Sequence, residues 1–336
     1  MGDHRRPVRG QRNSERDAKH GPRWRRWLLA LLLIAALVVA ALHFGDFKKF
    51  AQLVSRAEPL WLVGALLLQL ATYASLAGEW FLVLRAGKSK RPMRELLPLT
   101  IGKLLADQVV PTAGVSGDVF LVDRLVASGV RRELAVAAVI LAVIGYYLSY
   151  AVAALAAVVL MWLRDGVPMI VLGLVGLLLA VAAAIPGAAL WLQRNSRTKM
   201  PDWAKRFESI RELLELISAA PSKLVRNPGL IAQLTALNGA VFVIDALTLQ
   251  LCLLALGVHA PFTAAFVPFM MASIVVTLGP IPLGLGSFEA VSVGMLRLMG
   301  IPFEAALSAT LLLRGFTLWL PLVAGLFTTR RALRRT

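Results

Sequence analysis

The sequence has few of the residues that build most soluble sites. It contains one cysteine, Cys252, inside an apolar run, so we expect neither a disulfide framework nor a cysteine-based metal site. Its four histidines are scattered without the spacing of metal ligands, and we expect no metal. It shows no Ser-His-Asp order and no phosphate-cradling loop next to Lys and Ser or Thr. These absences predict no catalytic residues and no cofactor.

Long hydrophobic runs are what the sequence has in place of such motifs. Hydrophobic residues make up 58% of the chain and charged residues 16%. Several apolar runs approach or exceed the roughly 20 residues that a helix needs to cross a bilayer. The composition therefore predicts an all-α polytopic membrane protein.

Basic residues outnumber acidic ones by 36 to 19, and they gather beside the apolar runs. The clusters lie at residues 5–26, 85–94, 131–132, 194–226 and 330–335. Lys and Arg flanking membrane helices mark cytoplasmic loops, which can also touch anionic lipid head groups. We therefore predict no nucleic acid partner, a multi-pass protein of a bacterial inner membrane, and cytoplasmic N- and C-termini. The first apolar run lacks a convincing cleavage site and is expected to stay as an anchor.

Charge placement divides the chain into two membrane halves. We expect a basic cytoplasmic tail (1–26), a first membrane half (27–193), a basic amphipathic cytoplasmic linker (194–228), a second membrane half (229–328) and a basic cytoplasmic tail (329–336). The crossing helices are expected at 27–43, 59–84, 134–163, 167–193, 229–256 and 303–328. The prediction is thus about six full transmembrane helices.

Two further segments are expected to enter the membrane and return to the same side. The apolar stretch 96–110 has 15 residues, about 22 Å of helix against a hydrocarbon core of about 30 Å. It ends at PTAGVSGD, where Pro111, Gly114 and Gly117 interrupt the helix. We predict re-entrant hairpins over 96–128 and over 262–301, the second around GPIPLGLGSFE.

Residues 111–146 and 282–317 are distant copies held 171 positions apart. Nine of the 36 aligned pairs are identical, among them Pro111 with Pro282 and Gly129 with Gly300, and the acid Asp118 aligns with the acid Glu289. With the charge placement, the copies predict an inverted repeat of helix, hairpin and helix over 59–163 and 229–328.

The candidate site residues are helix-breaking glycines and charges at membrane depth. They are Lys103, Asp107, Gly114, Gly117, Asp118, Asp245, Gly284, Gly286, Glu289 and Arg314. Charges at the centre of a membrane helix cost at least about 2.5 kcal/mol each unless paired or hydrated. Glu289 is the expected partner of Arg314, and Lys103 and Asp107 lie four apart on one helical face. Glu79 is expected near an interface, where its side chain can reach water.

Each feature has a structural and a functional interpretation. Backbone groups freed by a break suit phosphate or carboxylate ligands, whereas glycines also permit tight helix packing. A Glu289–Arg314 pair can belong to a site or lock the hairpin against the following helix. Recurrence of the breaks in both halves favours a site.

The second-half tract PLGLGSFEAVSVGMLRLMGIPFEAALSATLLLRGFTLWLPLVAGL carries a family resemblance. It places Gly284, Gly286, Glu289, Gly300, Ala306, Arg314, Trp319, Pro321 and Gly325 in the order seen in the lysylphosphatidylglycerol synthase/flippase superfamily. PTAGVSGD resembles that family's first hairpin. The chain departs from the family at Ala142-Val143-Ile144, where a Glu-Arg pair is often found, so the role implied for that arginine is not expected here.

The resemblance implies lipid handling across nearly the whole chain. In bifunctional members the membrane module moves aminoacylated phosphatidylglycerol between leaflets, and a separate soluble domain, not expected here, attaches the amino acid. We therefore expect a non-enzymatic flippase for an anionic or aminoacylated phospholipid or a lipid-linked intermediate. One alternative is a non-transporting membrane partner of a lipid, glycolipid or hopanoid biosynthetic enzyme. Another is a lipid transferase with Asp118 or Glu289 as base.

Overall fold

The computed structural model describes residues 57–109, 115–164, 166–195, 220–279 and 284–321. These residues form α-helices and turns without a β-strand, so the all-α prediction is confirmed. Four helices are long and apolar enough to cross a membrane by length and composition: Pro59–Ala86, Arg132–Trp162, Met169–Ala188 and Pro228–Ala255. The expected helix 27–43, both tails and most of the linker 194–228 lie outside the described residues.

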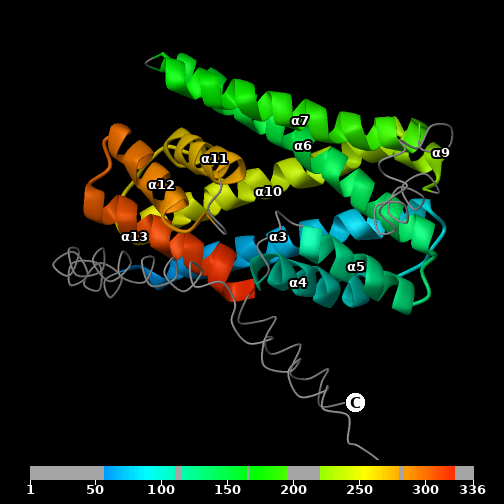
Figure 1. The fold of residues 1–336 in the computed structure, drawn as a ribbon. Helices are drawn as coiled ribbons and strands as arrows, with labels where there is room; N and C mark the ends of the chain where they lie inside the picture. Colours follow the sequence, from blue (N-terminus) through cyan, green and yellow to red (C-terminus); the bar gives the residue numbers. More distant parts are fainter. Residues whose placement is uncertain (1–56, 110–114, 165, 196–219, 280–283, 322–336) are drawn as a thin grey trace, which may run out of the picture. The chain divides into compact units, whose positions relative to one another are not determined.

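The elements follow one another with short connections (Figure 1). They are α3 (Pro59–Ala86), α4 (Met93–Val109), α5 (Val115–Ala127), α6 (Arg132–Trp162), α7 (Met169–Asn195), α9 (Ser222–Val225), α10 (Pro228–Ala255), α11 (Thr263–Leu278), α12 (Ser287–Leu298), α13 (Phe303–Arg314) and η4 (Gly315–Trp319). Most boundaries lie within two or three residues of the predicted ones. The expected helix 303–328 differs, because it changes at Gly315 into the π-helical η4.

Two helical hairpins lie where re-entrant segments were predicted. The first hairpin consists of α4 and α5, and the second consists of α11 and α12. The helices within each hairpin pack against each other. Each leading helix carries an internal proline at its sixth position, Pro98 in α4 and Pro268 in α11. In Figure 1 the two hairpins lie toward opposite ends of the long helix α10.

The same turn follows both hairpins. The amide of Val130 donates to the carbonyl of Leu125 at 3.0 Å, and that of Ile301 donates to Leu296 at 3.1 Å. Gly129 and Gly300 have φ of 89° and 86°, a left-handed conformation that glycine adopts at little cost. This conformational need explains the glycine that the two copies share.

α3 and α10 are antiparallel neighbours that hold the hairpins in place. A Cβ atom added at Gly64 would touch Leu251, and one at Gly78 would touch Leu237, so numbers rise along α3 as they fall along α10. Pro59 and Pro228 each stand in the first turn, where proline loses no helical hydrogen bond. Asn227 caps α10 by accepting from the amide of Leu230.

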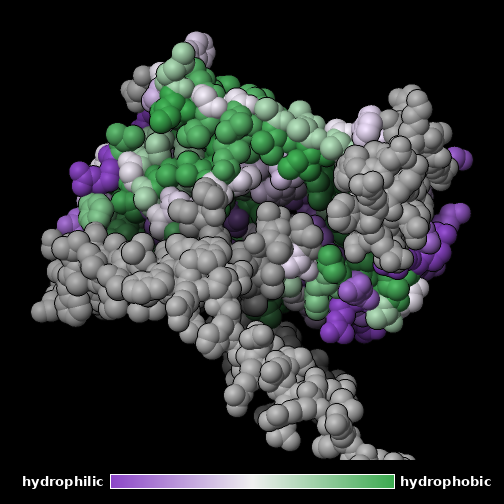
Figure 2. All heavy atoms as spheres, in the orientation of Figure 1, coloured by the Kyte–Doolittle hydropathy of each residue, from purple (hydrophilic) through white to green (hydrophobic). Residues whose placement is uncertain are grey.

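Hydrophobic side chains form two clusters, one around each hairpin. One cluster joins α6, α7 and α10 to the second hairpin and α13, and the other joins α3, α6 and α10 to the first hairpin. Figure 2 shows hydrophobic residues over α6 and α7 and hydrophilic residues toward the ends of the helices. This distribution is what a bilayer requires of a helical membrane protein.

Candidate functional site

The first hairpin contains a compact ion-pair cluster. The Nζ of Lys103 in α4 lies 2.9 Å from Oδ2 of Asp107 and 3.1 Å from Oδ1 of Asp118 in α5. All three side chains are mostly buried, with exposed fractions between 18% and 25%. Two carboxylates therefore share one ammonium group within the hairpin itself. The predicted Lys103–Asp107 pair is confirmed, and Asp118 joins it.

Gly117 lets the cluster reach the start of α5. Its amide donates to Oδ1 of Asp107 at 2.8 Å. A Cβ atom at this position would lie 2.4 Å from that same oxygen, so any larger residue would push the carboxylate away. Asp107 thus supplies the acceptor that the first N–H groups of a helix require.

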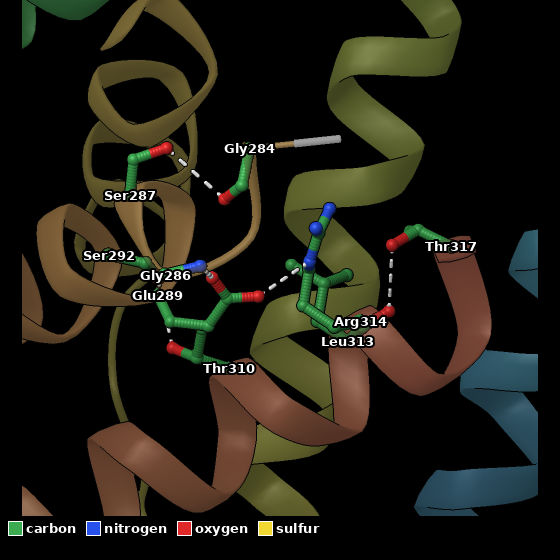
Figure 3. Close-up of polar contacts among 9 residues, drawn as sticks. All are labelled: Gly284, Gly286, Ser287, Glu289, Ser292, Thr310, Leu313, Arg314 and Thr317. Carbon is green, nitrogen blue, oxygen red and sulfur yellow. Dashed lines mark hydrogen bonds and ion pairs between the residues drawn. The ribbon is translucent and has the colours of Figure 1, made fainter. Parts of the chain in front are cut away.

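The second hairpin places its acid against a different helix. Oε1 of Glu289 accepts from Nε of Arg314 in α13 at 2.8 Å, and Oε2 accepts from the amide of Gly286 at 2.7 Å (Figure 3). The Arg314 guanidinium also lies 5.1 Å from the ring centre of Phe288, a cation–π geometry. The predicted Glu289–Arg314 pair is confirmed.

Two glycines shape the chain just before α12. Gly284 and Gly286 have φ of 61° and 84°. A Cβ atom at Gly284 would lie 2.3 Å from the side chain of Val276, so the chain can pass α11 closely only without one. The Ser287 hydroxyl donates to the Gly284 carbonyl at 3.2 Å (Figure 3). These contacts bring the Gly286 amide to Glu289.

A polar layer lies between α3, α10 and η4. The Thr72 hydroxyl donates to Oδ1 of Asp245 at 3.2 Å, and the Tyr73 hydroxyl donates to the carbonyl of Phe316 at 3.0 Å. A π-helical turn changes the regular backbone pairing of a helix, and such turns often mark functional sites. Through Thr72, Asp245 joins α10 to α3. It is not part of the polar contacts described above for the two hairpins.

Glu79 corrects one expectation from the sequence. It was expected near an interface with access to water, yet only 4% of it is exposed. Its Oε1 has no hydrogen-bond partner among the described residues. The carboxyl interacts with the Asn238 amide and lies within the electrostatic influence of Lys103 and Asp118. A hint in the sequence was the polar Asn238 inside a largely apolar helix, because a buried amide needs a polar neighbour.

An apolar groove of about 710 Å³ runs between α6 and α10. Small side chains leave the space open, and Phe266 of α11 also lines it. A Cβ atom at Gly239, which lines the groove, would meet nothing within 4 Å. The volume falls in the range of about 300–1,000 Å³ that is usual for small-ligand sites.

The predicted site residues thus fall into three groups. Lys103, Asp107, Gly117 and Asp118 meet in the first hairpin; Gly284, Gly286, Glu289 and Arg314 meet around the start of α12; and Asp245 contacts α3. Gly114 lies outside the described residues. Glu79, Asn238 and the groove were not among the predicted site features.

Comparison with known proteins identifies what the chain resembles. The family model described as "Lysylphosphatidylglycerol synthase TM region" matches residues 27–325. A UPF0104 membrane protein of Methanothermobacter thermautotrophicus is 26% identical over 125 residues. That alignment spans 35% of this chain and 37% of the archaeal protein. The family match covers every element described above.

Proposed function

The chain belongs to the lysylphosphatidylglycerol synthase TM-region family of membrane proteins, and from this premise we propose that it moves a lipid between bilayer leaflets. The head group binds at the two hairpins. The observation that carries the proposal is that a cation, at least one carboxylate and a helix-start N–H group meet at each hairpin inside an apolar bundle. At the second hairpin the cation comes from α13. Such groups are expensive in a membrane and mark substrate pathways.

The chemistry of the clusters suits a phosphate or an ammonium group. Asp107 and Glu289 accept from helix-start amides, a position that a phosphate oxygen also occupies well. A lipid phosphate replaces such a carboxylate on Lys103 or Arg314, and the freed carboxylate can then bind an ammonium group. The substrate class is therefore an anionic or aminoacylated phospholipid, or a lipid-linked intermediate.

The groove between α6 and α10 provides a place for the lipid's chain. Its lining is apolar except for the hydroxyls of Ser149 and Thr235. A lipid tail kept in this groove stays away from the charged clusters while the head group crosses. Residues Pro228 to Val243 line the groove on α10, which corresponds to about 22 Å at 1.5 Å per residue, more than half of a core about 30 Å thick.

The two halves act as an inverted repeat in this proposal. Antiparallel α3 and α10, matching prolines in α4 and α11 and matching turns after each hairpin support it. The hairpins then enter the membrane from opposite sides, as in carriers built from inverted repeats. The basic residues of the connection 85–94 support a cytoplasmic position for it at a bacterial inner membrane.

Transport into the outer leaflet of liposomes tests the proposal. Purified protein is reconstituted with fluorescent phosphatidylglycerol, lysylphosphatidylglycerol, polyprenyl phosphate or glycolipid, and a membrane-impermeant quencher reports arrival outside. We expect at least one lipid to cross faster than in protein-free liposomes. Equal rates for the whole panel, with the protein folded, would reject the flippase and favour the role of a partner to a biosynthetic enzyme.

A further inference from the structure

Glu79 is a buried acid inside a helix that is apolar enough to cross a membrane. It is one of two charged residues of α3, and the other, Arg85, is exposed near the end of the helix. Glu79 lies seven residues before that end, about 10 Å along the axis. Its 4% exposure and the unpartnered Oε1 separate it from the surface acids of the chain.

The charged groups around Glu79 do not supply it with a cation. α4 brings Lys103 and α5 brings Asp118, but the Lys103 ammonium is shared by Asp107 and Asp118 at 2.9 and 3.1 Å. α10 brings the neutral amide of Asn238. Three carboxyl groups therefore surround one ammonium group in this part of the molecule.

α6 also packs on α3 without adding a charge near Glu79. Its charged residues, Arg132 and Glu133, are confined to the first turn. That turn lies beside Gly87, eight residues beyond Glu79, because a Cβ atom at Gly87 would contact the Leu134 side chain. Neither residue interacts with Glu79 among the described contacts.

A buried carboxylate without a cation is strongly disfavoured, whereas a neutral acid needs only hydrogen bonds. We infer that Glu79 is a proton-binding site inside the membrane and that the Lys103–Asp118 pair controls whether the proton stays. The proton bonds to a Glu79 carboxyl oxygen, and Asn238 interacts with the same carboxyl.

A movement of α4 against α5 within the first hairpin would release this proton. When the Lys103 ammonium leaves Asp118 and approaches Glu79, the Glu79 O–H bond breaks and the proton passes to water as hydronium. Glu79 then pairs with Lys103, and the Asp118 carboxylate is free to bind an ammonium group of a head group. Proton release and head-group binding are thereby linked, a coupling that rests on the proposed function; the proton site itself does not.

The proton site belongs to one half of the molecule. α3 and α10 both have 28 residues, and the position of α10 that corresponds to Glu79 is Thr248. The Thr248 hydroxyl donates to the Ile244 carbonyl at 2.9 Å within its own helix. The α10 position that corresponds to Glu79 therefore has no acid, and the proposed coupling concerns the single proton of Glu79.

Infrared spectroscopy detects the proton directly. Protonated carboxyl groups give a C=O band that carboxylates lack and that shifts in D₂O. At neutral pH we expect Glu79→Gln to lose one such band, whereas Asp245→Asn, which changes another acid of the bundle, leaves that band in place. Glu79→Asp should shift the band and serves if Gln prevents folding. Matching wild-type and Glu79→Gln spectra from folded protein in this region would overturn the proton site.

A pH gradient across the liposomes tests the coupling. One proton per lipid shifts the steady-state ratio between leaflets by up to about tenfold for each pH unit, and Glu79→Gln abolishes the shift. A wild-type protein that moves lipid but ignores the gradient would overturn the coupling and leave the flippase standing. A protein that moves no lipid would reject the flippase and the coupling, while the infrared result still decides the proton site.

Discussion

The aligned acids of the two hairpins, Asp118 and Glu289, pair with cations from different helices. Asp118 pairs with Lys103 of the preceding helix, so the first cluster closes within its own hairpin. Glu289 pairs with Arg314 of the following helix, so the second cluster ties its hairpin to α13. The Ser292 and Thr310 hydroxyls, 3.0 Å apart, add a second tie between α12 and α13. The second hairpin is thus joined to a neighbouring helix by polar contacts, whereas the ion pairs of the first hairpin lie within that hairpin.

This difference in ion pairing indicates that the two hairpins differ in how easily they can move. A hairpin whose polar cluster is internal can shift against its neighbours without losing an ion pair to another helix. A hairpin fixed through an ion pair must break that pair to move, which is costly in an apolar environment. We therefore expect the first hairpin to be the moving element and the second to be the fixed one.

The side of the membrane from which each hairpin can be labelled tests the comparison of the two hairpins with the largest expected effect. In a Cys252→Ala background, Lys90→Cys should react with an impermeant thiol reagent only from the cytoplasm, and Arg164→Cys only from outside. Both positions are exposed. The proposed inverted arrangement predicts that Ser116→Cys and Leu285→Cys label from opposite sides. Labelling of both from one side would remove the inverted arrangement.

Breaking the Glu289–Arg314 pair should have the largest effect on stability. Glu289→Gln or Arg314→Met alone removes one partner of this mostly buried ion pair, which costs about 3–5 kcal/mol. The double variant leaves neither charge and should recover protein level, as measured by expression and thermal unfolding in detergent. A double variant that is also fully active would show that the pair is structural and no part of the head-group site.

Gly117→Ala should loosen the first hairpin by a smaller amount. Its Cβ would displace Asp107 from the Gly117 amide, and a buried unsatisfied donor costs about 1–3 kcal/mol. Gly294→Ala in α12 is the matched control, because a Cβ there meets nothing within 4 Å. The temperature of thermal unfolding should fall for Gly117→Ala and should stay the same or rise for Gly294→Ala. Equal stabilities for the two would contradict the role given to Gly117.

Gly239→Leu should fill the groove with little effect on folding. A Cβ atom there meets nothing within 4 Å, so we expect the added side chain to extend into the groove. We expect a several-fold slower lipid transfer at unchanged thermal stability. Gly176→Leu, on an exposed and open face of α7, adds the same side chain outside the groove. If both variants transport alike, the groove does not hold the lipid chain.

Much of the helical framework was predictable from periodicity and charge. The runs around α3, α6, α7 and α10 were located within two or three residues because apolar length and flanking basic residues mark their ends. The hairpins were predictable because Gly and Pro interrupt short apolar runs in both copies. The Glu289–Arg314 pair was predictable because a charge deep in a membrane helix needs a partner.

Partners that depend on how helices cross were not predictable. The sequence indicated no partner for Asp118, and the structure shows that its cation is Lys103 of the preceding helix. Glu79 was predicted to reach water because a sequence does not show which face of a helix is covered by neighbouring helices. In the structure α4 and α10 pack on α3, and Glu79 is buried.

The rate of lipid transfer in variants of both hairpins tests the central claim most directly. With the lipid that the wild-type protein moves, arrival in the outer leaflet is followed for Asp118→Asn and for Glu289→Gln, each reconstituted as folded protein in equal amount. The account predicts that both substitutions slow the transfer, because each hairpin contributes to the head-group site. Transfer at the wild-type rate in both variants would contradict it, since a flippase that ignores these two acids binds its lipid elsewhere.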